Sequence, residues 1–73
     1  MRQRLKRLCL KDHPVMVTLD RRDDGVAELR IYDISERTEP RLIRIKTLPE
    51  PTNRGARDVF QKWINHHYPA TKR

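Results

Sequence analysis

Arg30, Tyr32, Arg44 and Lys46 are the side chains best suited to contact nucleic acid, and they fall on alternate positions of two strand-like segments. Alternate residues of a strand point to the same face, so we expect all four on the uncovered face of a sheet. Cations contact phosphate, and an aromatic ring can stack on a base. Acids expected on the same surface dilute the positive field. An ordinary solvated sheet face is therefore the alternative.

Two more arginines, Arg54 and Arg57, stand near the start of a predicted helix. Positive charge at this end is unfavourable for the helix itself, because the helix dipole is already positive there. The same arrangement suits a bound phosphate, which free backbone N–H groups and two guanidinium groups can share. The alternative is an exposed helix that simply carries arginines.

Metal binding and catalysis find little support in the residue pattern. His66 and His67 are adjacent, so on a helix their side chains diverge by about 100°. No acid or cysteine stands four residues from either one, and we predict no metal and no cofactor. No catalytic motif is present, so we expect a protein that is not an enzyme. A small RNA-cleaving, toxin-like enzyme using His67, Tyr32 and Arg44 is kept as a third hypothesis, because such sites leave almost no motif.

The segment 13–48 alternates between polar and apolar residues, which predicts three antiparallel strands. The first strand covers 15–19, the second 26–34 and the third 41–48. Asp24-Gly25 between the first two predicts a hairpin, since glycine accepts a positive φ without steric cost. The apolar side chains expected to point inward from the sheet are Val15, Val17, Leu19, Ala27, Leu29, Ile31, Ile43 and Ile45.

The segment 53–68 changes to a helical period, with Thr52 or Asn53 as the N-cap and Pro69 as the stop. Its apolar stripe predicts a helix that covers one face of the sheet. The stripe comprises Ala56, Val59, Phe60, Trp63, Ile64 and His67. Of these, Val59, Phe60, Trp63 and Ile64 are expected to join the inward strand residues in the core.

The predicted fold class is therefore α+β, with one domain over residues 1–73: a small three-stranded sheet and one C-terminal helix. Residues 1–11 are open to three interpretations: a short helix, an extra strand or a basic arm ordered late. Residues 35–40 predict a mobile polar connection, and 69–73 a tail that frays from residue 70.

Charge is distributed unevenly along the chain, whose net charge is +7. Residues 1–11 contain five cations and no acid, and residues 12–34 contain six acids against three cations. This asymmetry predicts a protein that presents a particular face to a polyanion. The lone Cys9 fits a reducing compartment, and no apolar run approaches the length of a membrane span. We expect a cytoplasmic protein without membrane contact.

A small nucleic-acid-binding module is the function that these patterns favour, with an accessory or regulatory role and DNA preferred over RNA. The layout of three strands and a helix is similar, at the level of fold, to the arm-binding domains of phage and transposon integrases, which read DNA with a three-stranded sheet. The alternative is an inhibitor or adaptor of phage or plasmid type that binds an acidic protein through a sheet edge or the 35–40 loop. Leu42 and Leu48, expected to point outward, favour that alternative. Either protein would be a monomer or a homodimer.

Overall fold

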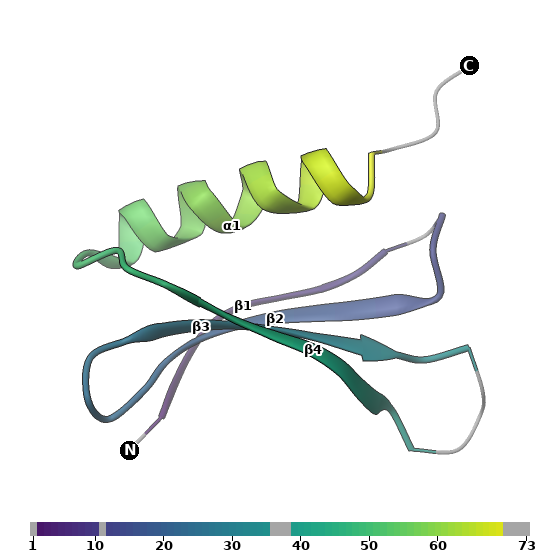
Figure 1. Cartoon of the computed structure of the whole chain (residues 1–73), viewed down its shortest axis with the longest axis horizontal. Helices are drawn as coiled ribbons and strands as arrows, with labels where there is room; N and C mark the ends of the chain where they lie inside the picture. The colour runs from purple at the N-terminus through teal and green to yellow at the C-terminus, as the bar shows by residue number, and fades with distance from the viewer. Residues whose placement is uncertain (1, 11, 36–38, 70–73) are drawn as a thin grey trace.

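Four antiparallel strands form one sheet in chain order, and a single helix crosses one face of it (Figure 1). The computed structural model describes residues 2–10, 12–35 and 39–69. The elements are β1 (Gln3–Cys9), β2 (Val15–Arg21), β3 (Ala27–Asp33), β4 (Arg41–Leu48) and α1 (Asn53–His67). The α+β class and the C-terminal helix are confirmed.

The N-terminal segment forms a strand, so the sheet has four strands where the sequence predicted three. Of the three interpretations of residues 1–11, the extra strand is confirmed for β1. It pairs with β2 in an antiparallel register that puts Leu8 opposite Val17, and a bulge lies between Arg4 and Lys6. Leu8 packs against the core from this edge. A sheet of β2, β3 and β4 alone would leave this apolar edge in water and the β2 edge unpaired, which explains why β1 joins the sheet.

The predicted hairpin joins β2 to β3. The N–H of Gly25 donates to the carbonyl of Arg22 at 2.9 Å, and the N–H of Arg22 donates to the carbonyl of Val26 at 2.8 Å. Gly25 has a φ of 89°, which a residue with a side chain rarely adopts. Asp24 accepts a hydrogen bond from the N–H of Val26 at 3.1 Å. Both residues of the Asp-Gly pair are thus required by the turn.

The helix begins as its capping residues predict. The hydroxyl of Thr52 accepts a hydrogen bond from the N–H of Gly55 at 3.0 Å, and the N–H of Tyr68 donates to the carbonyl of Ile64 at the other end. Below the helix lies the buried core: Val15, Val17, Leu19, Ala27, Leu29, Ile31, Leu48, Ala56, Phe60 and Ile64. Val59 and Trp63, predicted for this core, are partly buried and pack against it.

The face of β4 that points toward the helix side of the sheet is the one that alternation predicted to point away from it. Leu48, expected to point outward, is 2% exposed and pairs with the buried Ala27. Residues two apart on a strand share a face. Lys46 and Arg44 therefore lie on the helix side of the sheet, and their predicted place on the uncovered face is wrong.

Ile43 and Ile45, predicted for the core, are 51% and 47% exposed. Ile45 lies opposite Arg30 on the uncovered face, and Ile43 is the extra residue of a bulge. The physical reason is that α1 packs mainly over β1 and β2. β4 comes close to the helix only where it ends (Figure 1). Alternation separates the two faces of a strand but does not say which face is covered.

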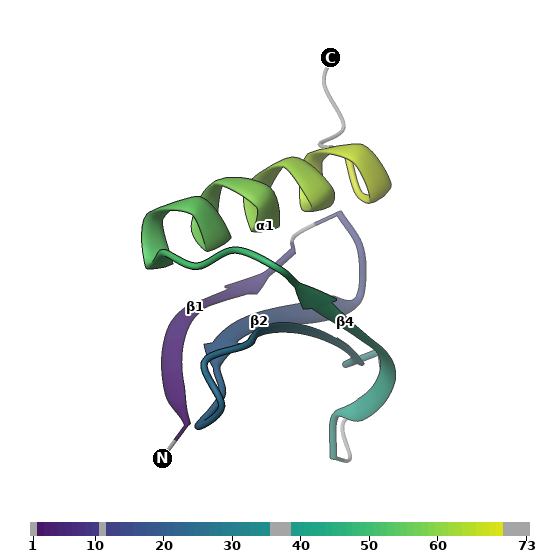
Figure 2. The ribbon, with the colours of Figure 1, turned by 60° about the vertical axis from the view of Figure 1, so that its left-hand side comes forward.

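The sheet arches beneath the helix, with its uncovered face on the inner side of the arch (Figure 2). In the part of the chain that the structure describes, no helix is long and apolar enough to cross a membrane. The predictions of a mobile 35–40 connection and of a fraying tail concern residues 36–38 and 70–73, which lie outside the described residues.

Candidate nucleic-acid interface

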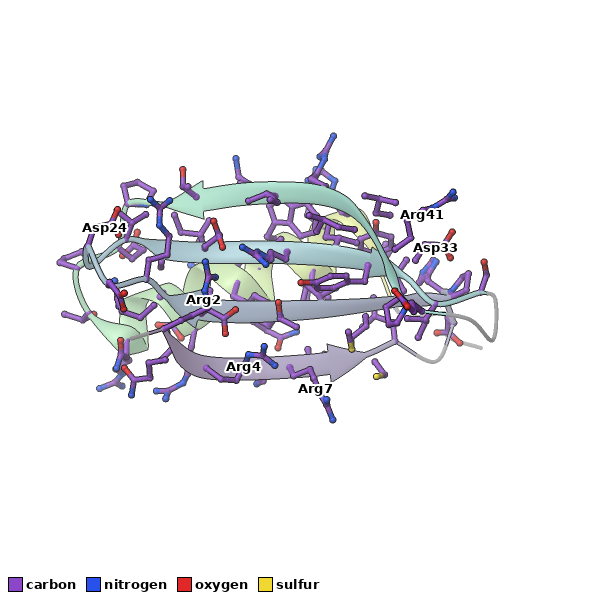
Figure 3. All side chains as sticks on the ribbon, turned by 90° about the horizontal axis from the view of Figure 1, so that it is seen from below. Arg2, Arg4, Arg7, Asp24, Asp33 and Arg41 are labelled. Carbon is purple, nitrogen blue, oxygen red and sulfur yellow. The ribbon has the colours of Figure 1, made fainter. Side chains whose placement is uncertain are left out.

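Three rows of side chains cross the uncovered face from β1 to β4, as the strand register dictates. The rows differ in chemistry, changing from ionic at one end of the sheet to apolar at the other. The charged row is Arg4, Asp20, Glu28 and Thr47; the mixed row is Arg7, Thr18, Arg30 and Ile45; the apolar row is Cys9, Met16, Tyr32 and Leu42. Figure 3 views this face and shows Arg4 and Arg7 on β1, with Arg2 over the neighbouring strands.

Two carboxylates of the charged row are buried although none of the described helices and strands covers this face. Asp20 is 2% and Glu28 6% exposed, because arginine side chains lie across them. Nη1 of Arg2 donates to Oε1 of Glu28 at 2.6 Å and lies 3.4 Å from Oδ2 of Asp20. Nε of Arg4 also donates to Asp20. The guanidinium groups of Arg2 and Arg4 therefore cover the two carboxylates of this row.

Glu28 also pairs with Arg30, whose Nε donates to the same Oε1 at 2.9 Å. Burial alone would raise the pKa of Glu28, but the hydrogen bonds from Arg2 and Arg30 outweigh it and the pKa is lowered. The carboxylate is thus held ionised. Arg2 and Arg30 are therefore occupied by an internal acid, and the uncovered face is much less basic than its arginines suggest.

Unpaired positive charge gathers instead on the other side of the molecule. Among the residues that the structure describes, seven cations make neither an ion pair nor a hydrogen bond: Lys6, Arg7, Arg44, Lys46, Arg54, Arg57 and Lys62. All but Arg7 lie on α1 or on helix-facing positions of β1 and β4. This side carries the positive field that a polyanion would meet.

A groove of about 300 Å³ opens where β4 diverges from the C-terminal half of the helix. We call it the β4–α1 groove. Its lining combines aliphatic, aromatic and cationic side chains: Ile31, Ile43, Arg44, Trp63, His67 and Tyr68. Arg44 is exposed, and Lys46 stands two residues further along the same side of β4.

The rings in the groove contact one another. The centroids of Trp63 and His67 are 4.2 Å apart, and those of Trp63 and Tyr68 are 6.0 Å apart. Partial desolvation lowers the pKa of His67, and the positive charges of His66, Arg44 and Lys46 lower it further. The lowered pKa favours the neutral form of His67, and the cation that lines the groove, Arg44, belongs to β4.

The two arginines predicted to clamp a phosphate at the helix start lie together on one flank of α1, away from Arg44 and Lys46. Arg54 and Arg57 are exposed, and by helical spacing Arg57 lies one turn before Gln61 on the flank that faces β1. A carboxylate of the chain also occupies the helix start: Oε1 of Glu50 lies 2.7 Å from where a Cβ on Gly55 would be. Glu50 thus supplies the negative charge that this end of the helix favours.

The six predicted contact residues consequently fall in three places. Arg30 and Tyr32 lie on the uncovered face, Arg44 and Lys46 beside the β4–α1 groove, and Arg54 and Arg57 on the far flank of the helix. Sequence reasoning missed the aromatic partners of β4, which are Trp63 and Tyr68. The sequence offered one signal: the apolar Leu48 stands on the same side of β4 as Arg44 and Lys46. Its burial places both cations on the helix side of the sheet.

Histidine side chains support the aromatic cluster. His13 meets Tyr68 edge to face, with centroids 5.1 Å apart, and its buried Nε2 has no hydrogen-bond partner among the described residues. The ring centroids of His66 and His67 are 4.8 Å apart, and the two rings are nearly perpendicular. Within residues 2–10, 12–35 and 39–69, no three His, Cys, Asp or Glu side chains could jointly hold a metal ion.

No family model matches the chain, and no curated protein or solved structure matches it either. The fold-level similarity to integrase arm-binding domains is thus without a matching structure. The site itself has to carry any functional argument.

Proposed function

We propose that this protein binds nucleic acid through the β4 side of the molecule, where Arg44 and Lys46 contact phosphates. The observation that carries the proposal is the division of cations: those on the uncovered face are mostly paired with Asp20 or Glu28. Among the described residues, those on the helix side are unpaired except for Arg21, which donates to Asn53 at the helix start. An unpaired guanidinium or ammonium group is free to replace the counterions of a phosphate backbone.

The proposal moves the contact surface away from the uncovered face. Arg30 donates to Glu28, so a phosphate would have to compete with a carboxylate already in contact. Tyr32 lies in the apolar row, next to Met16 and Leu42. Arg54 and Arg57 contribute long-range attraction rather than a clamp, because they lie on the flank of the helix that faces β1. The role remains accessory or regulatory, without catalysis.

Fluorescence anisotropy with a labelled duplex DNA and a labelled single-stranded RNA tests the proposal. Binding should weaken with salt, and the logarithm of the association constant should fall linearly with the logarithm of salt concentration. The double reversal Arg44→Glu/Lys46→Glu should weaken binding by about tenfold or more at low salt and flatten the salt slope by roughly 1 to 2, at about 0.9 per lost phosphate contact.

A matched control is the double reversal Arg54→Glu/Arg57→Glu, which changes net charge by the same amount on the other flank of the helix. It should cost less affinity than the β4 reversal. Equal losses would mean that binding depends on net charge alone. Absence of binding by the wild-type protein at low salt would refute the proposal. The cations would then serve solubility or the binding of an acidic protein.

A specific observation also favours the second candidate, a protein-interaction module. β4 is an edge strand, and it exposes Leu42, Ile43 and Ile45. An edge strand can extend its sheet with a strand of a partner, whose side chains then meet these apolar residues. A tagged protein should then retain one partner through purification in the absence of nucleic acid. Leu42→Glu/Ile45→Glu should lose that partner, whereas Arg54→Glu/Arg57→Glu should keep it.

A further inference from the structure

The β4–α1 groove has one wall of rings and one wall of strand. The rings of Trp63 and His67 are in contact and tilted, with 32° between their planes, and Tyr68 follows at the end of the helix. The backbone N–H of Tyr68 donates to Ile64, and the ring of Tyr68 is braced by His13. The aromatic wall is therefore fixed before any ligand arrives, which lowers the entropic cost of binding.

The opposite wall is supplied by β4. Arg44 lines the groove, and Lys46 lies two residues further along the same side of β4. Ile43 adds an exposed apolar surface. A ligand that fits both walls has a flat unsaturated ring and an anionic group at its edge. A nucleotide has this composition, and the groove volume of about 300 Å³ is at the small end of ligand sites.

We propose that the groove takes one unpaired base of a single-stranded nucleic acid, with the base against Trp63 and the adjoining phosphate on Arg44. This inference rests on the proposed function and adds the class of ligand. A base within a duplex is covered on both faces by its neighbours, so it cannot enter a groove of this size. A single strand presents its bases, and aromatic side chains bind them with little sequence preference.

Trp63 is the single tryptophan of the chain, so its intrinsic emission reports the groove directly. A dT oligonucleotide and a DNA hairpin, both end-labelled, are each titrated at low salt while label anisotropy and Trp63 emission are followed. The two strands of the hairpin are joined by a non-nucleotide linker, so that it contains no unpaired base. The oligonucleotide should quench Trp63 in parallel with the anisotropy change. The hairpin stem should bind through its phosphates and leave Trp63 emission unchanged.

Substitution separates stacking from charge. Trp63→Leu should weaken binding of the dT oligonucleotide by about tenfold to a hundredfold, a range typical of one stacked base, and leave hairpin binding within about twofold. Trp63→Phe keeps a ring and should restore most of the affinity. The matched control is Tyr32→Leu, which removes an aromatic ring from the uncovered face and should leave the affinity for both ligands unchanged. Circular dichroism confirms that each variant is folded.

The outcomes separate this inference from the function on which it rests. Oligonucleotide binding with unchanged Trp63 emission, or equal quenching by the hairpin, would overturn the groove as a base site and leave nucleic-acid binding intact. Absence of an anisotropy change with either ligand would refute both. The wild-type emission measurement decides the matter even if Trp63→Leu does not fold.

Discussion

At the scale of single residues, the most unusual feature is a pair of acids buried on a face left open by the part of the chain that the structure describes. Asp20 and Glu28 would be expected in water, yet Arg2 and Arg4 fold over them. A buried carboxylate is tolerated when it is paired and hydrogen-bonded. Arg2 and Arg4 are therefore structural, because they pair with the two acids of the charged row.

The first prediction concerns Glu28. Its pKa is lower in the folded protein than in the unfolded chain, so the unfolded state binds more protons in acid and stability falls as pH falls. This contribution is complete above the unfolded pKa and is lost as pH drops through the folded one. Glu28→Gln should cost about 1–2 kcal/mol at pH 7, since the half-exposed arginines are partly screened by solvent.

Urea denaturation between pH 7 and pH 3 measures the effect. The difference between wild type and Glu28→Gln should shrink as pH falls, because protonated Glu28 no longer attracts Arg2. Asp58→Asn is the control: it makes the same charge change on an exposed helix position and should stay within about 0.5 kcal/mol of wild type. A pH-independent difference would contradict the ionic role of Glu28.

At the scale of elements, the sequence predicted those features that local rules determine. The Asp24-Gly25 hairpin and the Thr52 cap follow from the backbone chemistry of two or three neighbouring residues. The helix stripe follows from its period. The side of β4 that is covered depends on where α1 lies across the sheet, which is a tertiary property. The same limit made Trp63 a core residue in the prediction, although it lies between the core and the groove.

The second prediction tests the orientation of β4. Leu48→Ala should cost about 2–5 kcal/mol of unfolding free energy, because it leaves a cavity under the helix start. Ile45→Ala should cost less than about 1 kcal/mol, because Ile45 is 47% exposed. Denaturant titrations of both variants measure these values. A larger loss of stability for Ile45→Ala than for Leu48→Ala would mean that β4 has the orientation that alternation predicted.

The third prediction concerns the contact between helix and sheet. Phe60 is 0% exposed and is the largest fully buried side chain that the structure describes. Phe60→Ala should cost about 3–5 kcal/mol, a large share of the stability of so small a domain. Thermal unfolding followed by circular dichroism should show loss of the cooperative transition near ambient temperature. A melt close to that of wild type would mean that α1 does not hold the sheet together.

At the scale of the whole molecule, the sheet has two open edges, and both carry cations. β1 holds Arg4, Lys6 and Arg7, β4 holds Arg41, Arg44 and Lys46, and neither strand contains an acid. Each edge strand also contains a bulge. Cations and bulges at sheet edges prevent strands of different copies from pairing. Edge-to-edge association would bring like charges together, so the charges that attract a polyanion also keep the copies apart.

The fourth prediction is that the protein is monomeric at low salt and associates as salt rises. The Debye length falls from about 30 Å at 0.01 M to about 3 Å at 1 M, so repulsion between edges fades while the apolar surface of Leu42, Ile43 and Ile45 remains. Sedimentation velocity at increasing salt measures the association, and Arg44→Gln/Lys46→Gln should associate at lower salt than wild type. A dimer that is stable at low salt would place an interface elsewhere. It would also contradict the view that the free β4 edge is kept open by its charge for a partner of opposite sign.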